Sequence, residues 1–530
     1  MKLIKYFISI SSLFVFISCA QVIPLSGGPK DNTAPKVVKT IPENNSCDFK
    51  SNSVSIEFDE YIQLKDLADQ FLMNPLQRES PEVEARGKKL FIRFRDSLKE
   101  NTTYTLNFGN AICDLHENNP LRNFSYSFST AKTMDTLRFV GNTFHVMDGK
   151  QLSNVFIGLY QSLDSYSFNY PEYSAYSDAN GTFQIDHLPN KVFYVLAFTD
   201  KNKNKLFDSN ELLSFSTEKI NFFETVKLPL ALPDFSSPLV RKTEWVHEGK
   251  ARVCYTSPVV NFNVVDESKR QLHCSKNISG DSVYVYFDTV FQDTTRFFVI
   301  RTKTIDSLSL VTNNNKKTKN LNEKPRILPA QLLTGKIMPC SELTFSVNRN
   351  YTSLNKDAFM LIQSGDTIEN TRYKIISSAP DSIRLLFDFS PSNSYRLIFF
   401  PTAILGFQNN SNDTTVFSFS VKNQEEISTL TAQVSIRNEG CYIFQLLTNN
   451  QNLIQKKTIC TNKNNATEKI VFSNLNSGDY FIRVIYDSDK NNNFSSFSLE
   501  KFQKAEKVFL YEKPIQIPEG WESEINFVLD

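Results

Sequence analysis

The chain has 530 residues, with 58 Lys and Arg against 57 Asp and Glu, and its formal net charge is +1. One hydrophobic core rarely serves more than about 250–300 residues, so we expect several domains. The near-neutral charge gives no overall field that would attract nucleic acid, which is therefore not an expected partner. The 45 Phe and 20 Tyr are typical of β-rich folds, and the 5 His leave few candidates for His-based catalysis.

The N-terminus has the pattern of a secretion signal. Residues 1–5 (MKLIK) are basic, and the apolar run over residues 6–17 is too short to span a bilayer, which takes about 20 residues. The pattern predicts a signal peptide over residues 1–18. Residues 16–19 (FISC) resemble the bacterial lipobox, which implies that Cys19 is lipidated and becomes the mature N-terminus. The alternative is ordinary signal cleavage beside a cysteine without a role.

A polar tether is predicted over residues 19–33. The stretch over residues 21–33 (QVIPLSGGPKDNT) contains Pro and Gly, which favours a flexible link over a folded element. Some surface-exposed lipoproteins of the Bacteroidota carry an acidic export signal directly after the lipidated cysteine. Residues 20–24 (AQVIP) are uncharged. This difference favours an outer-membrane anchor that faces the periplasm over one at the cell surface.

Apolar and polar residues then alternate with a period of two in several short segments. These segments are residues 54–58, 90–94, 104–108 and 124–128. Such alternation predicts half-buried β-strands. Turn-rich stretches such as residues 117–120 (ENNP) separate them, so one antiparallel β-sandwich is expected over about residues 34–131.

Two internal repeats organise the rest of the chain. Residues 96–129 align without gaps on residues 387–420, and residues 181–200 align on residues 468–487. The two offsets are close, which indicates one duplicated unit of two modules. With a central sandwich between the copies, the chain is predicted to be an all-β tandem array of about five antiparallel β-sandwich modules. We call these modules 1 to 5 in chain order: residues 34–131, 132–235, 236–324, 325–423 and 424–530.

Several motifs in these modules resemble known families. Module 1 contains APKVV at residues 34–38 and TYTL at residues 103–106, and it resembles the SbsA-type bacterial Ig-like domain. Modules 2 and 5 are similar to carboxypeptidase-regulatory, transthyretin-like sandwiches, in which a strand pair leads into an Asp/Asn loop. The C-terminal pattern, including WESEINF at residues 521–527, resembles the C-terminus of uncharacterised Ig-like lipoproteins of the Bacteroidota. The resemblance implies a domain architecture and a location in the cell envelope, and it does not imply a catalysed reaction.

The Asp/Asn loop of module 2 has the ligand spacing of a calcium-binding EF-hand loop. Its candidate oxygen ligands are Asp200, Asn202, Asn204, the carbonyl of Leu206, Asp208 and Glu211. Lys205 stands where Gly normally permits the sharp turn, and three lysines of the loop oppose a cation. The alternative is a polar loop that uses Asn and Asp for its turns.

Module 5 has a related loop. Its candidate ligands are Asp487, Asp489, Asn491 and Asn493. Asn492 stands at the turn position, where Asn tolerates a left-handed backbone better than Lys, but Ser498 stands where the closing acid is expected. The expected role is a structural Ca²⁺ ion that stiffens the loop, and no other cofactor is predicted.

One pair of cysteines stands out. With Cys19 lipidated, seven cysteines remain, and an odd number allows no complete disulfide framework. Cys441 and Cys460 flank a predicted hairpin that turns at residues 450–451, which places them opposite each other. They are candidates for a cross-strand disulfide, with buried or half-buried free thiols as the alternative.

The sequence shows no pattern that indicates an enzyme. Paired acids, a Ser/His/Asp set, a phosphate loop and a zinc motif are all missing at catalytic spacing, and the cluster at residues 114–117 (DLHE) lies in a predicted turn. We therefore predict a lipid-anchored, non-enzymatic scaffold of the cell envelope with envelope proteins as partners. The alternative is a carbohydrate-binding lipoprotein of a polysaccharide-uptake system, which the presence of only 2 Trp disfavours. An unrecognised hydrolase or hydrolase accessory protein is a third hypothesis.

Overall fold

The structure is a computed structural model, in which the chain forms two compact units. The first comprises residues 1–138 with 186–191, and the second comprises residues 139–185 with 192–530. No helix in the described part of the chain is long and apolar enough to cross a membrane. The structure describes residues 31–529 except 163–169, 235–237, 248, 257–258, 260, 278–279, 288–293, 302–303, 312–323, 330–334 and 407–408. The predicted signal peptide, Cys19 and most of the tether lie outside the described residues.

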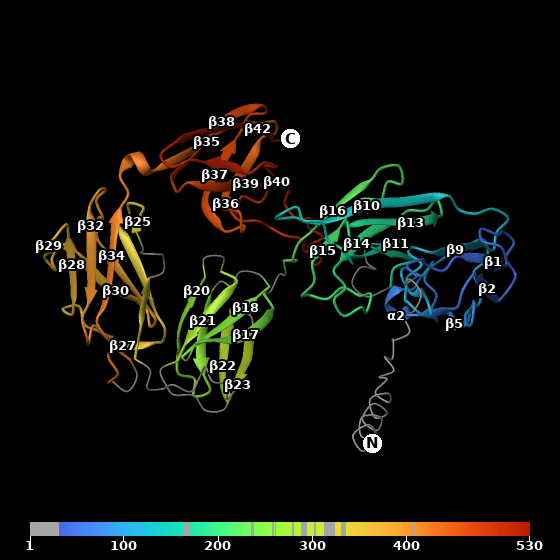
Figure 1. The fold of residues 1–530 in the computed structure, drawn as a ribbon, viewed down its shortest axis with the longest axis horizontal. Coiled ribbons are helices and arrows are strands. Elements are labelled where there is room, and N and C mark those ends of the chain that lie inside the picture. The colour runs from blue at the N-terminus through green and yellow to red at the C-terminus, as the bar shows by residue number, and fades with distance from the viewer. Residues whose placement is uncertain are drawn as a thin grey trace, which may run out of the picture. The chain divides into compact units, whose positions relative to one another are not determined.

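The first unit contains module 1, an all-β domain with one short helix, α2 (Leu67–Gln70) (Figure 1). Its strands are β1 (Val37–Ile41), β2 (Ser53–Phe58), β3 (Ile62–Leu64), β4 (Leu72–Asn74), β5 (Glu82–Arg86), β6 (Lys89–Arg93), β7 (Thr103–Asn107), β8 (Ile112–Asp114) and β9 (Ser125–Ser129). They form sheets of order β1-β2-β6-β5, β4-β7-β9 and β3-β8. Alternate residues of β2, namely Val54, Ile56 and Phe58, are buried, as its period of two predicts.

Module 2 supplies strands that belong mostly to the second unit. They are β10 (Leu137–His145), β11 (Phe156–Tyr160), β12 (Tyr173–Tyr176), β13 (Thr182–Leu188), β14 (Tyr194–Phe198), β15 (Leu213–Phe215) and β16 (Val226–Leu230). The sheets have the order β13-β10-β16 and β12-β11-β14-β15, and β10 pairs with β16 in parallel. The Asp/Asn loop of this module connects the adjacent strands β14 and β15.

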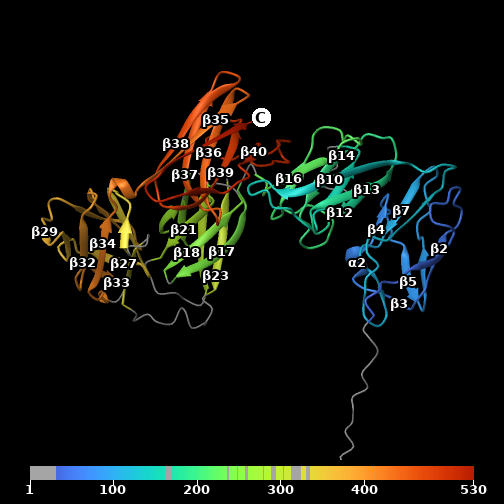
Figure 2. The same cartoon turned by 45° about the horizontal axis from the view of Figure 1, so that its top comes forward.

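Module 3 is also a pair of antiparallel sheets. Its strands are β17 (Val240–His247), β18 (Lys250–Tyr255), β19 (Phe262–Asp266), β20 (His273–Lys276), β21 (Ser282–Tyr286), β22 (Thr294–Arg301) and β23 (Ile305–Val311). The order is β17-β18-β21-β20 in one sheet and β19-β22-β23 in the other. Strands β17, β18 and β21 lie side by side in both views (Figures 1 and 2). Its core is a separate hydrophobic cluster that includes Val253, Val285 and Phe297.

Module 4 repeats the strand arrangement of module 1. Its strands are β24 (Ile327–Pro329), β25 (Gly335–Ile337), β26 (Glu342–Val347), β27 (Tyr351–Leu354), β28 (Phe359–Gln363), β29 (Asp366–Ile368), β30 (Lys374–Ala379), β31 (Ser382–Leu386), β32 (Ser394–Phe399), β33 (Ile404–Gly406) and β34 (Thr415–Val421). The order β24-β26-β31-β30 corresponds to β1-β2-β6-β5, and β28-β32-β34 corresponds to β4-β7-β9. Tyr104 stacks on Phe128 with ring centroids 5.3 Å apart, and Tyr395 stacks on Phe419 at 5.7 Å. The aligned residues of the first repeat therefore occupy equivalent core positions.

Module 5 repeats the topology of module 2. After the short 3₁₀ helix η3 (Gln424–Glu426), its strands are β35 (Ser428–Ile436), β36 (Gly440–Thr448), β37 (Leu453–Thr461), β38 (Ala466–Leu475), β39 (Gly478–Asp487), β40 (Val508–Leu510), β41 (Ile515–Ile517) and β42 (Glu522–Leu529). The order β38-β35-β42 matches β13-β10-β16, including the parallel pair β35 and β42. The order β37-β36-β39-β40 matches β12-β11-β14-β15. The second Asp/Asn loop connects β39 to β40, at the same place in the topology as the first.

Candidate cation-binding loops

The first residue of the module 2 loop, Asp200, points into the loop. Asp200 is 8% exposed, and its Oδ2 accepts hydrogen bonds from the Tyr176 hydroxyl (3.0 Å) and the Lys205 N–H (3.0 Å). The bond from Lys205 crosses the loop, so the carboxylate faces the loop interior. Its other oxygen, Oδ1, is buried and has no hydrogen-bond partner. The φ angles of Lys203 (59°) and Lys205 (62°) are left-handed, and this conformation winds the chain round the carboxylate.

Glu211 closes the module 2 loop by hydrogen bonds to its backbone. Its side chain is fully buried, and its two carboxylate oxygens accept the N–H groups of Lys201 (2.6 Å) and Asp208 (3.0 Å). Burial raises the pKa of Glu211 despite these two donors, and the nearby carboxylates of Asp200 and Asp208 raise it further. The carboxylates of Asp200 and Asp208 are therefore near enough to Glu211 to affect its charge.

The two asparagines of this loop complete a connected network. Asn202 and Asn204 direct their Nδ2 atoms to Asp208 Oδ2, at 2.6 and 3.3 Å. Their Oδ1 atoms accept the N–H groups of Asn204 (3.1 Å) and Leu206 (2.7 Å). The structure thus brings the side chains of the predicted ligands into one loop, while Leu206 takes part through its N–H.

The module 5 loop has the same internal hydrogen bonds. Asp487 is 2% exposed, and its Oδ2 accepts the N–H of Asn492 at 2.9 Å, as Asp200 Oδ2 accepts that of Lys205. Asp489 Oδ1 accepts the N–H of Asn491 at 3.0 Å. In the next step of the same pattern, the Asn493 N–H donates to Asn491 Oδ1 at 2.7 Å.

A glutamate that sequence spacing did not identify completes the module 5 loop. One carboxylate oxygen from each of Asp487, Asp489 and Glu506 lies within 4.8 Å of the others, close enough to hold a metal ion. Glu506 is 5% exposed and accepts the N–H groups of Ser488 (2.6 Å) and Ser495 (2.9 Å). Burial raises the pKa of Glu506, and nearby Asp489 adds to the rise despite the hydrogen bonds to Ser488 and Ser495. Ser498 stands at the spacing of the expected acid, so a fixed spacing could not find Glu506.

A different signal could have found Glu506. Only Leu212 separates Glu211 from β15, and only Lys507 separates Glu506 from β40. Each glutamate thus stands at the same place before the next strand. Counting back from that strand, rather than forward from the first aspartate, would have paired the two residues.

A disulfide lies beside the module 5 loop. Cys441 and Cys460 face each other in the register of β36 and β37, and a disulfide joins them. On its other side, Cys441 is opposite Asp487, the first residue of the loop. Among the described cysteines the free thiols are Cys47, Cys113, Cys254, Cys274 and Cys340.

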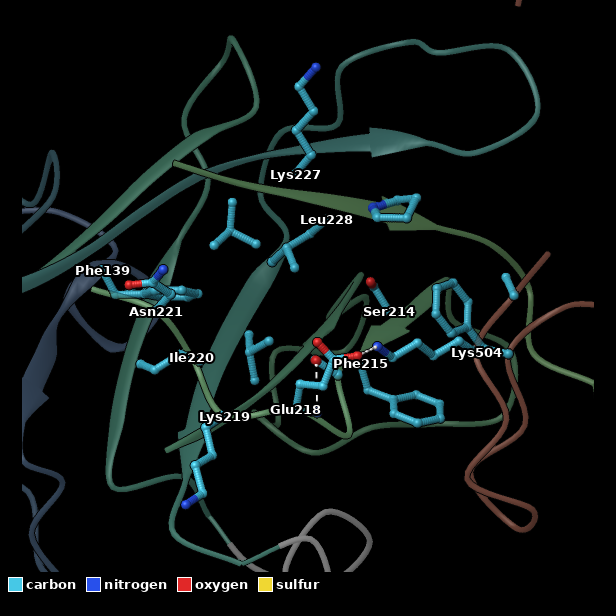
Figure 3. Close-up of a pocket in the computed structure, with 16 residues that line it drawn as sticks. Phe139, Ser214, Phe215, Glu218, Lys219, Ile220, Asn221, Lys227, Leu228 and Lys504 are labelled. Atoms are coloured by element: carbon cyan, nitrogen blue, oxygen red, sulfur yellow. Dashed lines mark hydrogen bonds and ion pairs between the residues drawn. The ribbon is translucent and has the colours of Figure 1, made fainter. Parts of the chain in front are cut away.

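The part of the module 5 loop between Asn493 and Glu506 packs into the core of module 2. Phe497 is 3% exposed and belongs to a hydrophobic cluster with residues of β11, β14 and β15, with its ring centroid 5.6 Å from that of Phe215. The Asp234 N–H donates to the Phe497 carbonyl at 2.6 Å. Lys504 forms an ion pair with Glu218 at 2.7 Å, among the side chains that line a pocket of module 2 (Figure 3). These contacts form a joint between modules 2 and 5.

A buried arginine adds to this joint. Arg483 of β39 is 9% exposed, and its Nη1 donates to the carbonyl of Met147 at 2.9 Å, while its Nε donates to Gln445 Oε1 at 2.7 Å. Burial lowers the pKa of Arg483, and nearby Asp148 opposes that shift. The joint therefore combines apolar packing with charged groups that are hydrogen bonded.

The polar cluster of module 1 has a structural explanation. Asp114 is 2% exposed, and its carboxylate accepts four backbone N–H groups, from His116, Glu117, Asn118 and Asn119. Burial would raise the pKa of Asp114, but these four donors outweigh it and hold the pKa below its usual value. The cluster predicted to lie in a turn thus fixes that turn.

These features define an all-β protein of tandem β-sandwich modules with two related polar loops. Module 1 can be assigned to a family, because residues 31–130 match the family model of the bacterial Ig-like domain. No curated protein sequence matches the chain.

Solved structures with similar folds include the major pilin subunit BcpA of Bacillus cereus, at 11% identity over 74% of this chain and 99% of that chain, with a TM-score of 0.15. Domains 1–6 of the surface layer protein SbsC are similar at 10% identity over 91% of this chain and 67% of that chain, with a TM-score of 0.14. Dimeric latent PorU from Porphyromonas gingivalis is similar at 10% identity over 50% of this chain and 31% of that chain, with a TM-score of 0.18. Similarity at this level carries no argument about function.

Proposed function

We propose that the protein is a lipid-anchored lipoprotein of the cell envelope that acts as a non-enzymatic scaffold for assembly or protein partnering. The observation that carries the proposal is the repeated use of one pair of modules, since modules 1 and 4 share a sheet order and modules 2 and 5 share another. Tandem sandwiches provide length and broad protein-binding surfaces. The match of residues 31–130 to the bacterial Ig-like domain supports the structural part of this role.

The polar groups described above favour a structural role over catalysis. The Asp114 carboxylate is occupied by four backbone N–H donors, which leaves it unsuited to proton transfer. Glu211 and Glu506 each accept two backbone N–H groups inside loops. Such acids hold backbone in place.

Cys19 is the proposed attachment point to the outer membrane. The FISC pattern at residues 16–19 supports it, and two acyl chains suffice for stable anchoring. Cys19→Ala should abolish labelling by a fatty-acid analogue and shift the protein from the membrane fraction to the soluble fraction. Cys47→Ala, which removes an exposed cysteine of module 1, is the matched control and should leave both readouts unchanged. Unchanged fractionation of Cys19→Ala would refute anchoring.

The proposed location is the periplasmic face of the outer membrane. The uncharged residues 20–24 support it. Protease added to intact cells should leave the chain uncut, whereas the same protease should cut it after the outer membrane is permeabilised. Cleavage in intact cells would place the protein at the cell surface instead.

The proposed partners are envelope proteins. Cross-linking of intact envelopes followed by purification of the tagged chain should recover a defined protein partner, and the Cys19→Ala variant should recover less of it. The purified chain should also be tested against immobilised glycans. Specific glycan binding without any protein partner would replace the scaffold by a carbohydrate-binding lipoprotein.

A further inference from the structure

The module 2 loop contains a buried carboxylate oxygen that no group of the protein satisfies. Asp200 is 8% exposed, and its Oδ2 has two donors while its buried Oδ1 has none. A buried polar atom without a partner costs about 1–3 kcal/mol, and more for a charged group. A cation bound beside the Asp200 carboxylate would give Oδ1 a partner.

The charge of the loop interior identifies the ligand as a cation. Asp200, Asp208 and Glu211 bring three carboxylates to one loop, and Glu211 is fully buried. The nearest lysine along the chain, Lys201, directs its Nζ to the carbonyl of Asn210 at 2.8 Å. A buried charge is stabilised by a paired charge or a metal ion.

The module 5 loop gives an independent example of the same loop conformation and of the same hydrogen bonds to a closing glutamate. In both loops the closing glutamate accepts two backbone N–H groups, from Lys201 and Asp208 in one and from Ser488 and Ser495 in the other. Lys490 and Asn492 have left-handed φ angles of 57° and 61°, close to those of Lys203 and Lys205. Among the described residues, the three acidic oxygens that lie within 4.8 Å of one another are those of Asp487, Asp489 and Glu506, in the module 5 loop.

We propose that the loop of residues 200–211 binds a divalent cation of the calcium class through carboxylate oxygens of Asp200, Asp208 and Glu211. Ca²⁺ takes six to eight oxygen ligands with flexible geometry, whereas Mg²⁺ requires a near-ideal octahedron. The side-chain oxygens of Asn202 and Asn204 are available to complete the shell once the cation replaces their loop hydrogen bonds. The ring of Phe207 lies 6.0 Å from that of Phe198 and packs against the cluster that holds Phe497, so the bound ion stabilises the joint between modules 2 and 5.

Calorimetry on the full chain tests the site, which does not depend on the proposed scaffold role. The full chain is purified, stripped with a chelator and titrated with CaCl₂ and with MgCl₂. Asp489→Asn and Glu506→Gln are combined to disable the module 5 loop, so that the heat of binding reports on the module 2 loop. In this background Ca²⁺ should bind once, and more tightly than Mg²⁺. Adding Asp200→Asn or Glu211→Gln should weaken Ca²⁺ binding by about tenfold or more, because each removes a ligand charge.

Asp178→Asn is the matched control. Asp178 lies in the same module on an exposed turn, and its carboxylate accepts the N–H groups of Asn180 (2.9 Å) and Thr182 (2.8 Å). Its replacement removes one charge and the same kind of hydrogen bond outside the loop. Ca²⁺ affinity should stay within about twofold of the background value. An equal loss of affinity in the control and in Asp200→Asn would show a general charge effect and overturn the site.

Terbium luminescence locates the ion. The Tyr176 hydroxyl lies 3.0 Å from Asp200 Oδ2, so excitation of tyrosine should produce Tb³⁺ emission that excess Ca²⁺ abolishes. Tyr176→Phe should lower this emission while calorimetric Ca²⁺ binding persists. If Asp200→Asn does not fold, Lys205→Gly provides a second test. This variant removes a positive charge and places Gly at a position with a left-handed backbone, so Ca²⁺ binding should become tighter. Absence of both Ca²⁺ heat and Tb³⁺ emission in the parent chain would overturn the proposal.

Discussion

Glu211 and Glu506 accept hydrogen bonds from equivalent backbone groups, although they lie at different distances along the chain from those groups. Glu211 Oε1 accepts the N–H of Lys201, 10 residues away, and Glu506 Oε1 accepts the N–H of Ser488, 18 residues away, both at 2.6 Å. The longer return in module 5 carries Phe497 into the core of module 2. Both loops therefore keep the same hydrogen bonds to the closing glutamate, while the additional residues of the module 5 loop form the contact with module 2.

Phe497→Ala should weaken the joint between modules 2 and 5. The ring is 3% exposed and contacts Phe215, so its removal leaves a cavity and should lower the free energy of unfolding by about 3–5 kcal/mol. Denaturant unfolding of the full chain measures the loss, and limited proteolysis should show faster cleavage near residue 500. Phe502→Ala, at a 44% exposed Phe of the same segment, should change stability by less than about 0.5 kcal/mol. Equal losses in both variants would contradict the packing argument.

The paired tyrosines of modules 1 and 4 should respond alike to loss of the hydroxyl. The Lys99 N–H donates to the Tyr104 hydroxyl at 2.7 Å, and the Ser390 N–H donates to the Tyr395 hydroxyl at 2.9 Å. Tyr104→Phe and Tyr395→Phe should each lower the free energy of unfolding of their module by about 1 kcal/mol, since a backbone donor loses its partner. Tyr61→Phe, at a 55% exposed ring, is the control for hydroxyl removal and should be neutral in denaturant unfolding. A loss in only one of the two modules would argue against their equivalence.

Asp114 should make the stability of module 1 depend on acid pH. Four backbone donors outweigh burial and hold the pKa of Asp114 below its ordinary value of 3.8. A carboxyl whose pKa is lowered by folding stabilises the protein above its unfolded pKa, and that contribution is lost as the pH falls through the folded pKa. Thermal unfolding of the parent chain should therefore show a steep loss of stability below about pH 4.

The matched variant is Asp114→Asn. It should lower the free energy of unfolding by about 1.5–3 kcal/mol at pH 7, because hydrogen bonds to a charged acceptor are lost. The difference between the parent and the variant should shrink as the pH falls below about 4. A difference that stayed constant with pH would show that the charge of Asp114 is not responsible.

The disulfide should stabilise module 5. Cys441 and Cys460 are separated by 19 residues, and a loop of this size gives about 3 kcal/mol in the chain-entropy account of disulfides. Reductant should lower the denaturant midpoint of this module by a corresponding amount. The Cys441→Ser, Cys460→Ser double variant should start at the lower midpoint and no longer respond to reductant. A parent chain indifferent to reductant would contradict a stabilising role.

Sequence alone was sufficient for features that repeat locally. The period of two at residues 54–58 predicts a strand, and β2 (Ser53–Phe58) buries alternate residues there. The alignment of Tyr104 on Tyr395 follows from a constant offset, and the two rings occupy equivalent core positions. Alternation and repeat offsets are read along the chain, and a sheet translates them directly into which side chains face the core.

Only the tertiary structure decided which acid closes the module 5 loop and which modules touch. Spacing places Ser498 where Glu506 acts, because the return segment that contains Phe497 is inserted between loop and strand. Hydrogen bonds from Ser488 and Ser495 identify Glu506 as the closing acid, although its distance along the chain from the first aspartate differs from that of Glu211. The sequence by itself determined an array of β-sandwiches with two polar loops. The tertiary structure determined which acid completes the module 5 loop and how modules 2 and 5 contact each other. Such distant segments meet only when their apolar faces are buried together.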